Sequence, residues 1–128
     1  MYVNLSQLLL GASISRPKIL GFRHRGTCVD TACQRVVDSM PQSGARVVSL
    51  PIFSAGFPTT VDSVGLSLAQ QQIRAARALN QVGRLAYAQA DCDVLATYAE
   101  TGEAWSPQLV KAVLVAGFIG LGILALEN

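Results

Sequence analysis

The sequence predicts a mainly α protein with a long amphipathic helix, a C-terminal hydrophobic helix of the transmembrane type, and an irregular or short-β N-terminal half. Three observations lead to this prediction. No polar or charged residue occurs from Ala112 to Leu126. The chain from about Leu66 to Ala99 lacks proline and repeats apolar residues at helical spacing. Between Pro41 and Gly65 the chain is rich in Pro, Gly, Ser, Thr and β-branched residues, which are typical of turns and short strands.

Length and composition predict one domain with a largely apolar sequence. The 128 residues include 51% hydrophobic and 14% charged residues, and the net charge of +2 is too small to indicate nucleic-acid binding. We divide the chain into three parts. Residues 1–65 form an irregular region with a short helix around 29–40, residues 66–104 a long amphipathic helix, and residues 105–128 a C-terminal transmembrane anchor.

The N-terminal part contains one helical pattern and one apolar segment. Five residues recur at spacings of four, seven, eight and eleven, which predicts a helix over 29–40 that ends at Pro41: Val29, Cys33, Val36, Val37 and Met40. Residues 47–53 are expected to form an edge strand, because Pro51 has no N–H for a ladder. The apolar 47–58 segment has few local residues to cover it, so we expect it to contact other protein subunits.

The long helix over 66–99 is predicted to have two different sides. Glutamine and arginine lie on one side, at positions 70, 74, 77, 81 and 84, and mostly alanine lies on the other. We interpret the arginine side as a solvated face, with an interface as the alternative.

The C-terminal segment has the dimensions of a membrane span. Pro107 to Leu126 comprises 20 residues, and a helix of that length measures about 30 Å, the thickness of a bilayer core. Ser106 is expected to cap the helix, and Pro107 suits its first turn. Trp105 and Lys111 would then lie at the membrane interface. A buried core helix of a soluble bundle and a helix lying on a surface are the alternatives.

Small residues form a ridge on this helix. Ala112, Ala116 and Gly120 are four residues apart, so they stack on one side and allow another helix to approach closely. We predict that they form a helix-packing ridge.

The positive charges are concentrated near the N-terminus. Arg16, Lys18, Arg23 and Arg25 lie close together in the sequence with the single histidine, His24. This cluster is expected to contact phosphates, anionic lipid head groups or an acidic partner. An ordinary solvated loop is the alternative reading.

The chain shows no catalytic, cofactor-binding or metal-binding pattern. Cys28, Cys33 and Cys92 are an odd number of cysteines, and a disulfide between Cys28 and Cys33 is possible. The spacing of His24 to the first two cysteines differs from that of structural zinc sites. A cysteine nucleophile would need a histidine base, and the single histidine lies in the basic stretch. No enzymatic role is therefore predicted.

These observations together predict a non-enzymatic, membrane-anchored structural subunit of a larger assembly. Candidates are a minor protein of a membrane-containing virion and an accessory subunit of a membrane complex. The expected partners are a lipid bilayer and other protein subunits in an oligomer or hetero-complex, with the bulk of the chain on the N-terminal side of a single span. One alternative is a soluble helical interaction or regulatory module with a buried C-terminal helix, and another is a small membrane-active pore or delivery protein.

Overall fold

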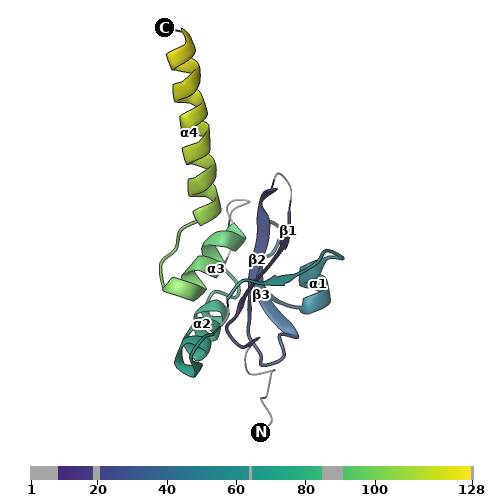
Figure 1. Cartoon of the computed structure of the whole chain (residues 1–128). Coiled ribbons are helices and arrows are strands. Elements are labelled where there is room, and N and C mark those ends of the chain that lie inside the picture. Colours follow the sequence, from purple (N-terminus) through teal and green to yellow (C-terminus); the bar gives the residue numbers. More distant parts are fainter. Residues whose placement is uncertain (1–8, 19–20, 64, 85–90, 128) are drawn as a thin grey trace.

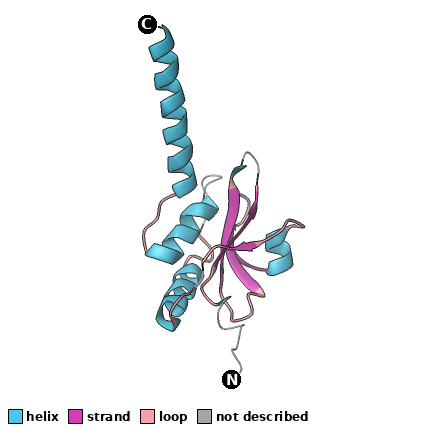
Figure 2. Ribbon diagram, in the orientation of Figure 1, coloured by secondary structure: helices cyan, strands magenta, loops and turns pink. Residues whose placement is uncertain are grey.

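The computed structural model describes residues 9–18, 21–63, 65–84 and 91–127, and beyond residue 117 it describes only the course of the backbone. Within these residues the strands are β1 (Ser13–Pro17), β2 (Arg23–Cys28), β3 (Arg35–Met40), β4 (Gly44–Ser49) and β5 (Thr60–Val61). The helices are α1 (Leu50–Ser54), α2 (Leu68–Asn80), α3 (Asp91–Thr101) and α4 (Pro107–Glu127). Helix α1 covers one face of the sheet, α2 and α3 cover the other, and α4 leaves the domain (Figures 1 and 2).

The five described strands form one antiparallel sheet in the order β4-β3-β2-β1-β5. The first four strands are neighbours in sequence and in space, so short connections join them, and β5 returns to pair with β1. This sheet contradicts the prediction of a mainly α fold. The N-terminal half, predicted to be irregular or short-β, contains the five described strands and forms the centre of the domain.

The helix predicted over 29–40 is wrong, because residues 35–40 form β3. Val36 pairs with Val48 and Val37 with Val47 on β4. Val36 and Val37 are both buried, and they belong to the clusters on opposite faces of the sheet. Because two adjacent valines face opposite sides of the sheet, β3 lacks a simple alternation of apolar and polar residues. Together with Val29, Cys33 and Met40 they also match helical spacing.

The predicted edge strand over 47–53 is half right. β4 is an edge strand, but it ends at Ser49, whose hydroxyl caps α1 by accepting a hydrogen bond from the Ile52 N–H. Pro51 lies in the first turn of α1, where a missing N–H costs nothing. The short helix places Phe53 in the core on this face of the sheet, with Ile14 and Val36.

The single long helix predicted over 66–99 is also wrong. α2 starts at a capping box formed by Ser67 and Gln70 and ends at Asn80. Gly83 then turns the chain with φ of +93°, and its N–H donates to the carbonyl of Ala45 on the edge strand. Residues 85–90 lie outside the described part. Helix α3 follows and packs with α2 on the second face, in a core that includes the following residues: Val37, Ala45, Ala78, Leu95 and Ala99.

Helix α4 begins at Pro107, as predicted, and the Ser106 hydroxyl accepts a hydrogen bond from the Leu109 N–H. Among the residues that the structure describes, no helix is both long enough and apolar enough to cross a bilayer. The predicted transmembrane anchor, and with it the membrane location and its single C-terminal span, is therefore wrong. The uninterrupted apolar run of this helix is shorter than the approximately 20 residues that a span requires.

Candidate functional site

The first turn of α3 carries two adjacent side chains, Cys92 and Asp93, to the central strand β2. Cys92 reaches His24, and Asp93 reaches Arg25. Two polar clusters result. The thiol cluster consists of Cys92, His24 and Asp38, and the root cluster consists of Arg25, Asp93, Glu100, Ser106 and Gln108.

The thiol cluster joins a thiol, an imidazole and a carboxylate in that order. The Cys92 side chain is hydrogen-bonded to His24, and His24 Nε2 lies 2.8 Å from Asp38 Oδ2. Arg46 on β4 donates from Nε to Asp38 Oδ1 at 2.8 Å. Lys18 Nζ lies 3.9 Å from Cys92 Sγ. Positive groups therefore flank both the carboxylate and the thiol.

These contacts shift three pKa values against the effect of burial. Burial alone would lower the pKa of His24, but its hydrogen bonds to Asp38 and Cys92 raise it above 6.5. Burial would raise the pKa of Cys92, but hydrogen bonds from His24 and from the Arg25 backbone lower it. Burial would likewise raise the pKa of Asp38, but its interactions with His24 and Arg46 together lower it. The cluster thus favours the charged form of all three groups.

The order of the three groups resembles that of a nucleophile, its base and the acid that orients the base. Their burial argues against catalysis, because Cys92 is 2% exposed, His24 3% and Asp38 0%. Reactive cysteines lie in partly exposed surroundings. In the described residues β2 pairs with β3 only at Thr27 and Cys28. We interpret the thiol cluster as the packing that fills the space where the two strands diverge.

The root cluster holds a buried arginine between two acids of α3. Arg25 Nη1 donates to Asp93 Oδ1 at 2.6 Å and to Thr97 Oγ1 at 3.0 Å, and its Nη2 pairs with Glu100. Burial alone would raise the pKa of Asp93, but its hydrogen bonds, first of all that from Arg25, lower it. Asp93 is therefore a carboxylate at neutral pH.

Asp93 also fastens the start of α4. Its Oδ2 accepts hydrogen bonds from Ser106 Oγ at 2.7 Å and from the Gln108 N–H at 3.0 Å. The Gln108 side chain accepts from the Arg23 N–H at 2.7 Å and donates to the Arg23 carbonyl at 3.1 Å. A carboxylate at a helix N-terminus is also favoured by the helix dipole. The first turn of α4 is thus bound to both α3 and β2.

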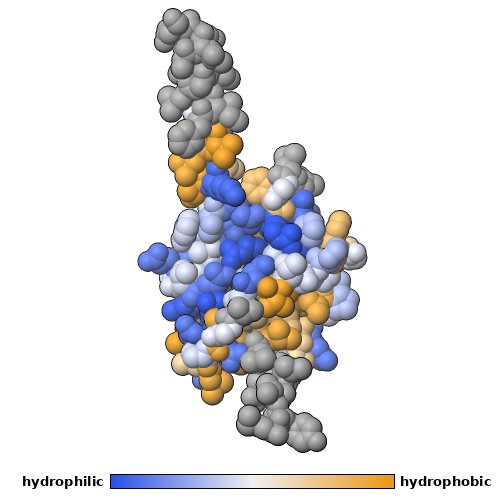
Figure 3. Space-filling model, in the orientation of Figure 1, coloured by the Kyte–Doolittle hydropathy of each residue, from blue (hydrophilic) through white to orange (hydrophobic). Residues whose placement is uncertain are grey.

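An open groove of about 740 Å³ lies between the start of α4 and the β1–β2 hairpin. Its apolar lining includes Phe22, Ala112, Val115 and Ala116, and its charged lining is as follows: Arg23, Arg25, Asp62, Asp93 and Lys111. Figure 3 shows apolar surface at the start of α4, directly next to the polar surface of the domain. The groove is therefore apolar along the helix and charged where the helix meets the sheet.

The four basic residues predicted to contact anions mostly make hydrogen bonds within the protein. Arg16 Nε donates to the carbonyl of Phe53 at 2.6 Å. Arg23 donates to side chains of β1 and β5, Arg25 belongs to the root cluster, and Lys18 lies beside the thiol cluster. Contact of this group with an external anion stays a prediction.

The residues predicted to have roles at the C-terminal helix lie in different surroundings in the structure. Trp105 is exposed in the connection between α3 and α4, and Lys111 is exposed beside the groove. Their membrane-interface role depended on the transmembrane anchor and has no support here. Ala112 and Ala116 line the groove, whereas Gly120 belongs to the part of α4 described by its backbone alone. Association through this ridge stays a prediction.

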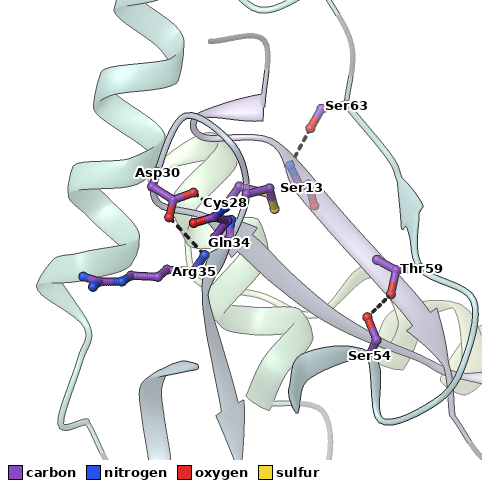
Figure 4. The surroundings of a disulfide bond; sticks show 9 residues. Ser13, Cys28, Asp30, Gln34, Arg35, Ser54, Thr59 and Ser63 are labelled. Atoms are coloured by element: carbon purple, nitrogen blue, oxygen red, sulfur yellow. Dashed lines mark hydrogen bonds between the residues drawn. A yellow bond between two sulfur atoms is a disulfide. The ribbon is translucent and has the colours of Figure 1, made fainter. Parts of the chain in front are cut away.

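Cys28 and Cys33 form a disulfide, a pairing that the sequence left open, with their Cα atoms 4.9 Å apart (Figure 4). The bond closes the turn between β2 and β3. In the same turn the Asp30 carboxylate accepts hydrogen bonds from the N–H groups of Gln34 and Arg35 (Figure 4). In the described part of the chain, no three His, Cys, Asp or Glu side chains are placed so that they could hold a metal ion together.

The apolar 47–58 segment divides between core and surface. Phe53 is fully buried, whereas Val47, Ile52 and Phe57 are exposed. Arg16 lies over the Phe57 ring at 5.7 Å from its centroid. The predicted contact of this segment with other subunits stays a prediction.

Sequence reasoning missed both clusters. The single histidine was not expected to pair with a cysteine, yet Cys92, 68 residues away, contacts it. One local signal for the root cluster existed, because Asp93, Thr97 and Glu100 are spaced by four and seven and share one face of α3. Nothing in the spacing indicated that Arg25 would meet that face.

Comparison with known proteins gives no further guidance, since neither a family model nor a curated protein matches the sequence.

Proposed function

We propose that this protein is a non-enzymatic subunit of a larger assembly and that it joins a partner protein through α4. The observation that carries the proposal is the exposure of this helix: Val113, Leu114 and Val115 are all more than half exposed, and the helix leaves the domain (Figure 1). An amphipathic or apolar helix binds a partner by laying such residues into a groove or against another helix. Burying these three half-exposed side chains would contribute roughly 3 kcal/mol.

The root cluster supports this proposal, because it holds α4 in place before any partner binds. Asp93 fixes Ser106 and Gln108, and Gln108 is bonded to the backbone of β2. A binding element that is already ordered loses less conformational entropy on association.

The small residues of α4 indicate what kind of partner fits. Ala112, Ala116 and Gly120 are four apart, so they form one ridge of the helix. A second helix can approach closely along such a ridge. The exposed part of the 47–58 segment, with Val47, Ile52 and Phe57, is the second surface that we expect to contact a subunit.

The burial of the thiol cluster supports the non-enzymatic part of the proposal. Its cysteine has the neighbours of an activated nucleophile but almost no contact with solvent. The same groups join α3 to the sheet, which is a structural role.

Site-specific photocrosslinking in the organism that encodes the chain tests the proposal. A benzoylphenylalanine residue at position 114 of α4 should form protein adducts of discrete mass. The matched control is position 68 on α2, because Leu68 is 62% exposed and Leu114 57%. A third variant at position 52 reports on the 47–58 segment.

The outcomes separate the possible attachments. Discrete adducts at 114 and none at 68 support the proposal. Crosslinking of position 114 to lipid alone, or adducts at 52 or 68 without any at 114, would show that α4 does not join a protein partner.

A further inference from the structure

The groove at the start of α4 has a polar end and an apolar wall that no contact described above occupies. Arg23 lies at the end nearest the sheet, since its backbone is bonded to Gln108 in the first turn of α4, and Lys111 follows about one turn further along the helix. Ala112, Val115 and Ala116 continue the lining along the helix, away from that end. From Gln108 to Ala116 the helix rises by about 12 Å.

The two cations at the polar end have hydrogen-bond donors to spare. Arg23 uses Nε on Ser15 Oγ at 2.8 Å and Nη2 on Thr60 Oγ1 at 3.1 Å. Within the described residues its Nη1 has no partner, and neither does the exposed ammonium group of Lys111. An arginine and a lysine so placed suit the oxygens of a carboxylate or phosphate.

The other charged residues that line the groove leave an excess of positive charge there. Arg25 pairs with Asp93, which also lines the groove, and with Glu100, which does not. Asp62 is an exposed carboxylate at the groove, and Thr60 Oγ1 donates to it at 3.1 Å. Two cations therefore face one acid that already accepts a hydrogen bond.

We propose that this groove binds a small amphiphile with an anionic head and an apolar chain. The head, a carboxylate or phosphate, lies between Arg23 and Lys111, and the chain lies along Ala112, Val115 and Ala116. The volume of about 740 Å³ is that of a pocket for a small organic molecule. An apolar wall with a few polar groups at one end is the usual design of such pockets. This inference does not rest on the partner protein proposed for α4, but ligand and partner would both use Ala112, Val115 and Ala116, so they would compete for this surface.

Titration of the full chain with decanoate, below the concentration at which it forms micelles, tests the proposal. Calorimetry should show saturable binding to one site, and the NMR signals of Ala112 and Ala116 should shift with the same dissociation constant. Decyltrimethylammonium, which has the same chain and a positive head, should bind at least about tenfold more weakly. Acetate and inorganic phosphate, which lack the chain, should leave these signals unchanged.

Two substitutions and one control locate the site. Lys111→Gln should weaken decanoate binding about three- to fivefold, the effect of losing one exposed charge contact. Ala116→Phe should abolish binding by filling the groove, and because position 116 is exposed on α4 the fold should be retained, as circular dichroism can verify. Arg35→Gln removes a comparable charge from an exposed position outside the groove and should leave the affinity unchanged.

Several results would overturn the proposal. Equal binding of the cationic amphiphile, or equal shifts at Val113 and Leu114, would mean unselective contact with the apolar helix. Full occupancy by acetate or phosphate would mean an anion site without a chain subsite. Unchanged affinity in both Lys111→Gln and Ala116→Phe would place any decanoate elsewhere on the protein.

Discussion

Asp93→Asn is the sharpest test of the root cluster, because it keeps the shape of the side chain and removes its charge. In the native protein Asp93 Oδ1 accepts from Arg25, and Oδ2 accepts from Ser106 and from the Gln108 N–H. An asparagine has one acceptor oxygen and one donor nitrogen. Whichever way the amide is turned, a donor must face a donor, either the Arg25 guanidinium or the Gln108 N–H.

The expected loss of stability is about 2–4 kcal/mol. Breaking a buried ion pair by removing one partner costs about 3–5 kcal/mol. Arg25 is 14% exposed and keeps Glu100, which reduces that cost. Weaker hydrogen bonds to Ser106 and Gln108 add to the loss, since bonds to a charged acceptor contribute about 1.5–3 kcal/mol each and neutral ones about 1 kcal/mol.

The sign of the pH dependence follows from the lowered pKa of Asp93. A carboxyl group whose pKa is lower in the folded than in the unfolded state stabilises the fold above its ordinary pKa of about 4. That stabilisation is lost as the pH falls through the lowered folded pKa. The stability difference between the native protein and Asp93→Asn should therefore be complete at pH 7 and shrink under acid conditions.

Urea unfolding of both proteins, followed by circular dichroism at pH 7 and at intervals down to pH 3, measures these effects. Asp62→Asn is the control, because it removes an exposed carboxylate whose described hydrogen-bond partner is Thr60. The control should change the free energy of unfolding by less than about 0.5 kcal/mol. If Asp93→Asn were no more destabilising than Asp62→Asn, or if its effect were independent of pH, the buried ion pair would not hold α4 in place.

Three further predictions concern the sheet. Loss of the Cys28–Cys33 disulfide, by reduction or by serine at both positions, should lower the free energy of unfolding by about 2 kcal/mol, because the bond closes a short loop in the unfolded chain. Denaturation with and without reductant measures this effect, and equal midpoints would refute the prediction. NMR titration should give His24 a pKa above 6.5, so its stabilisation is complete below that value and is lost as the pH rises through the raised pKa. Asp38→Asn should lower this pKa, because burial is then opposed less, and an unchanged value would disprove the pairing. Gly26→Ala should destabilise by about 1–3 kcal/mol in thermal unfolding, because its Cβ would lie 2.6 Å from a core valine methyl group, and a neutral effect would argue against that packing.

The start of α4 could be predicted because its signals are local. Ser106 and Pro107 are adjacent, and both have a preferred place at a helix start. The structure confirms the cap and the first helical residue. The turn closed by Cys28 and Cys33 was recognised as an option for the same reason, since the two cysteines are only five residues apart.

The central strand could not be predicted, because its residues look like those of a loop. Arg23, His24 and Arg25 are polar in sequence, so β2 has no alternation of apolar and polar residues. They are tolerated at the centre of a sheet because Asp38 and Asp93, from two other elements, hydrogen-bond to His24 and Arg25. A pattern that depends on partners so far away in the sequence is invisible in any short window.

The two polar clusters could not be predicted for the same reason, because their residues lie far apart in the sequence. If residues 66–99 formed one helix, as predicted, Cys92 and Asp93 would lie deep inside it, and nothing would indicate that they contact β2. In the structure they belong to the first turn of a separate helix, α3, whose buried face lies on the sheet. Pairing Cys92 with His24 required knowledge of the fold, not of the residue types.

The fastening of α4 has a mechanical consequence. A pull along this helix is not carried by the connection at residues 102–105 alone, because Gln108 is bonded to the backbone of β2 and Asp93 links the helix to Arg25 on the same strand. Tension would therefore enter the sheet through its middle strand. At the far end of that strand Cys28 is bonded covalently to Cys33, just before β3 begins. Force applied at α4 is thus passed through hydrogen bonds and along one strand to a disulfide.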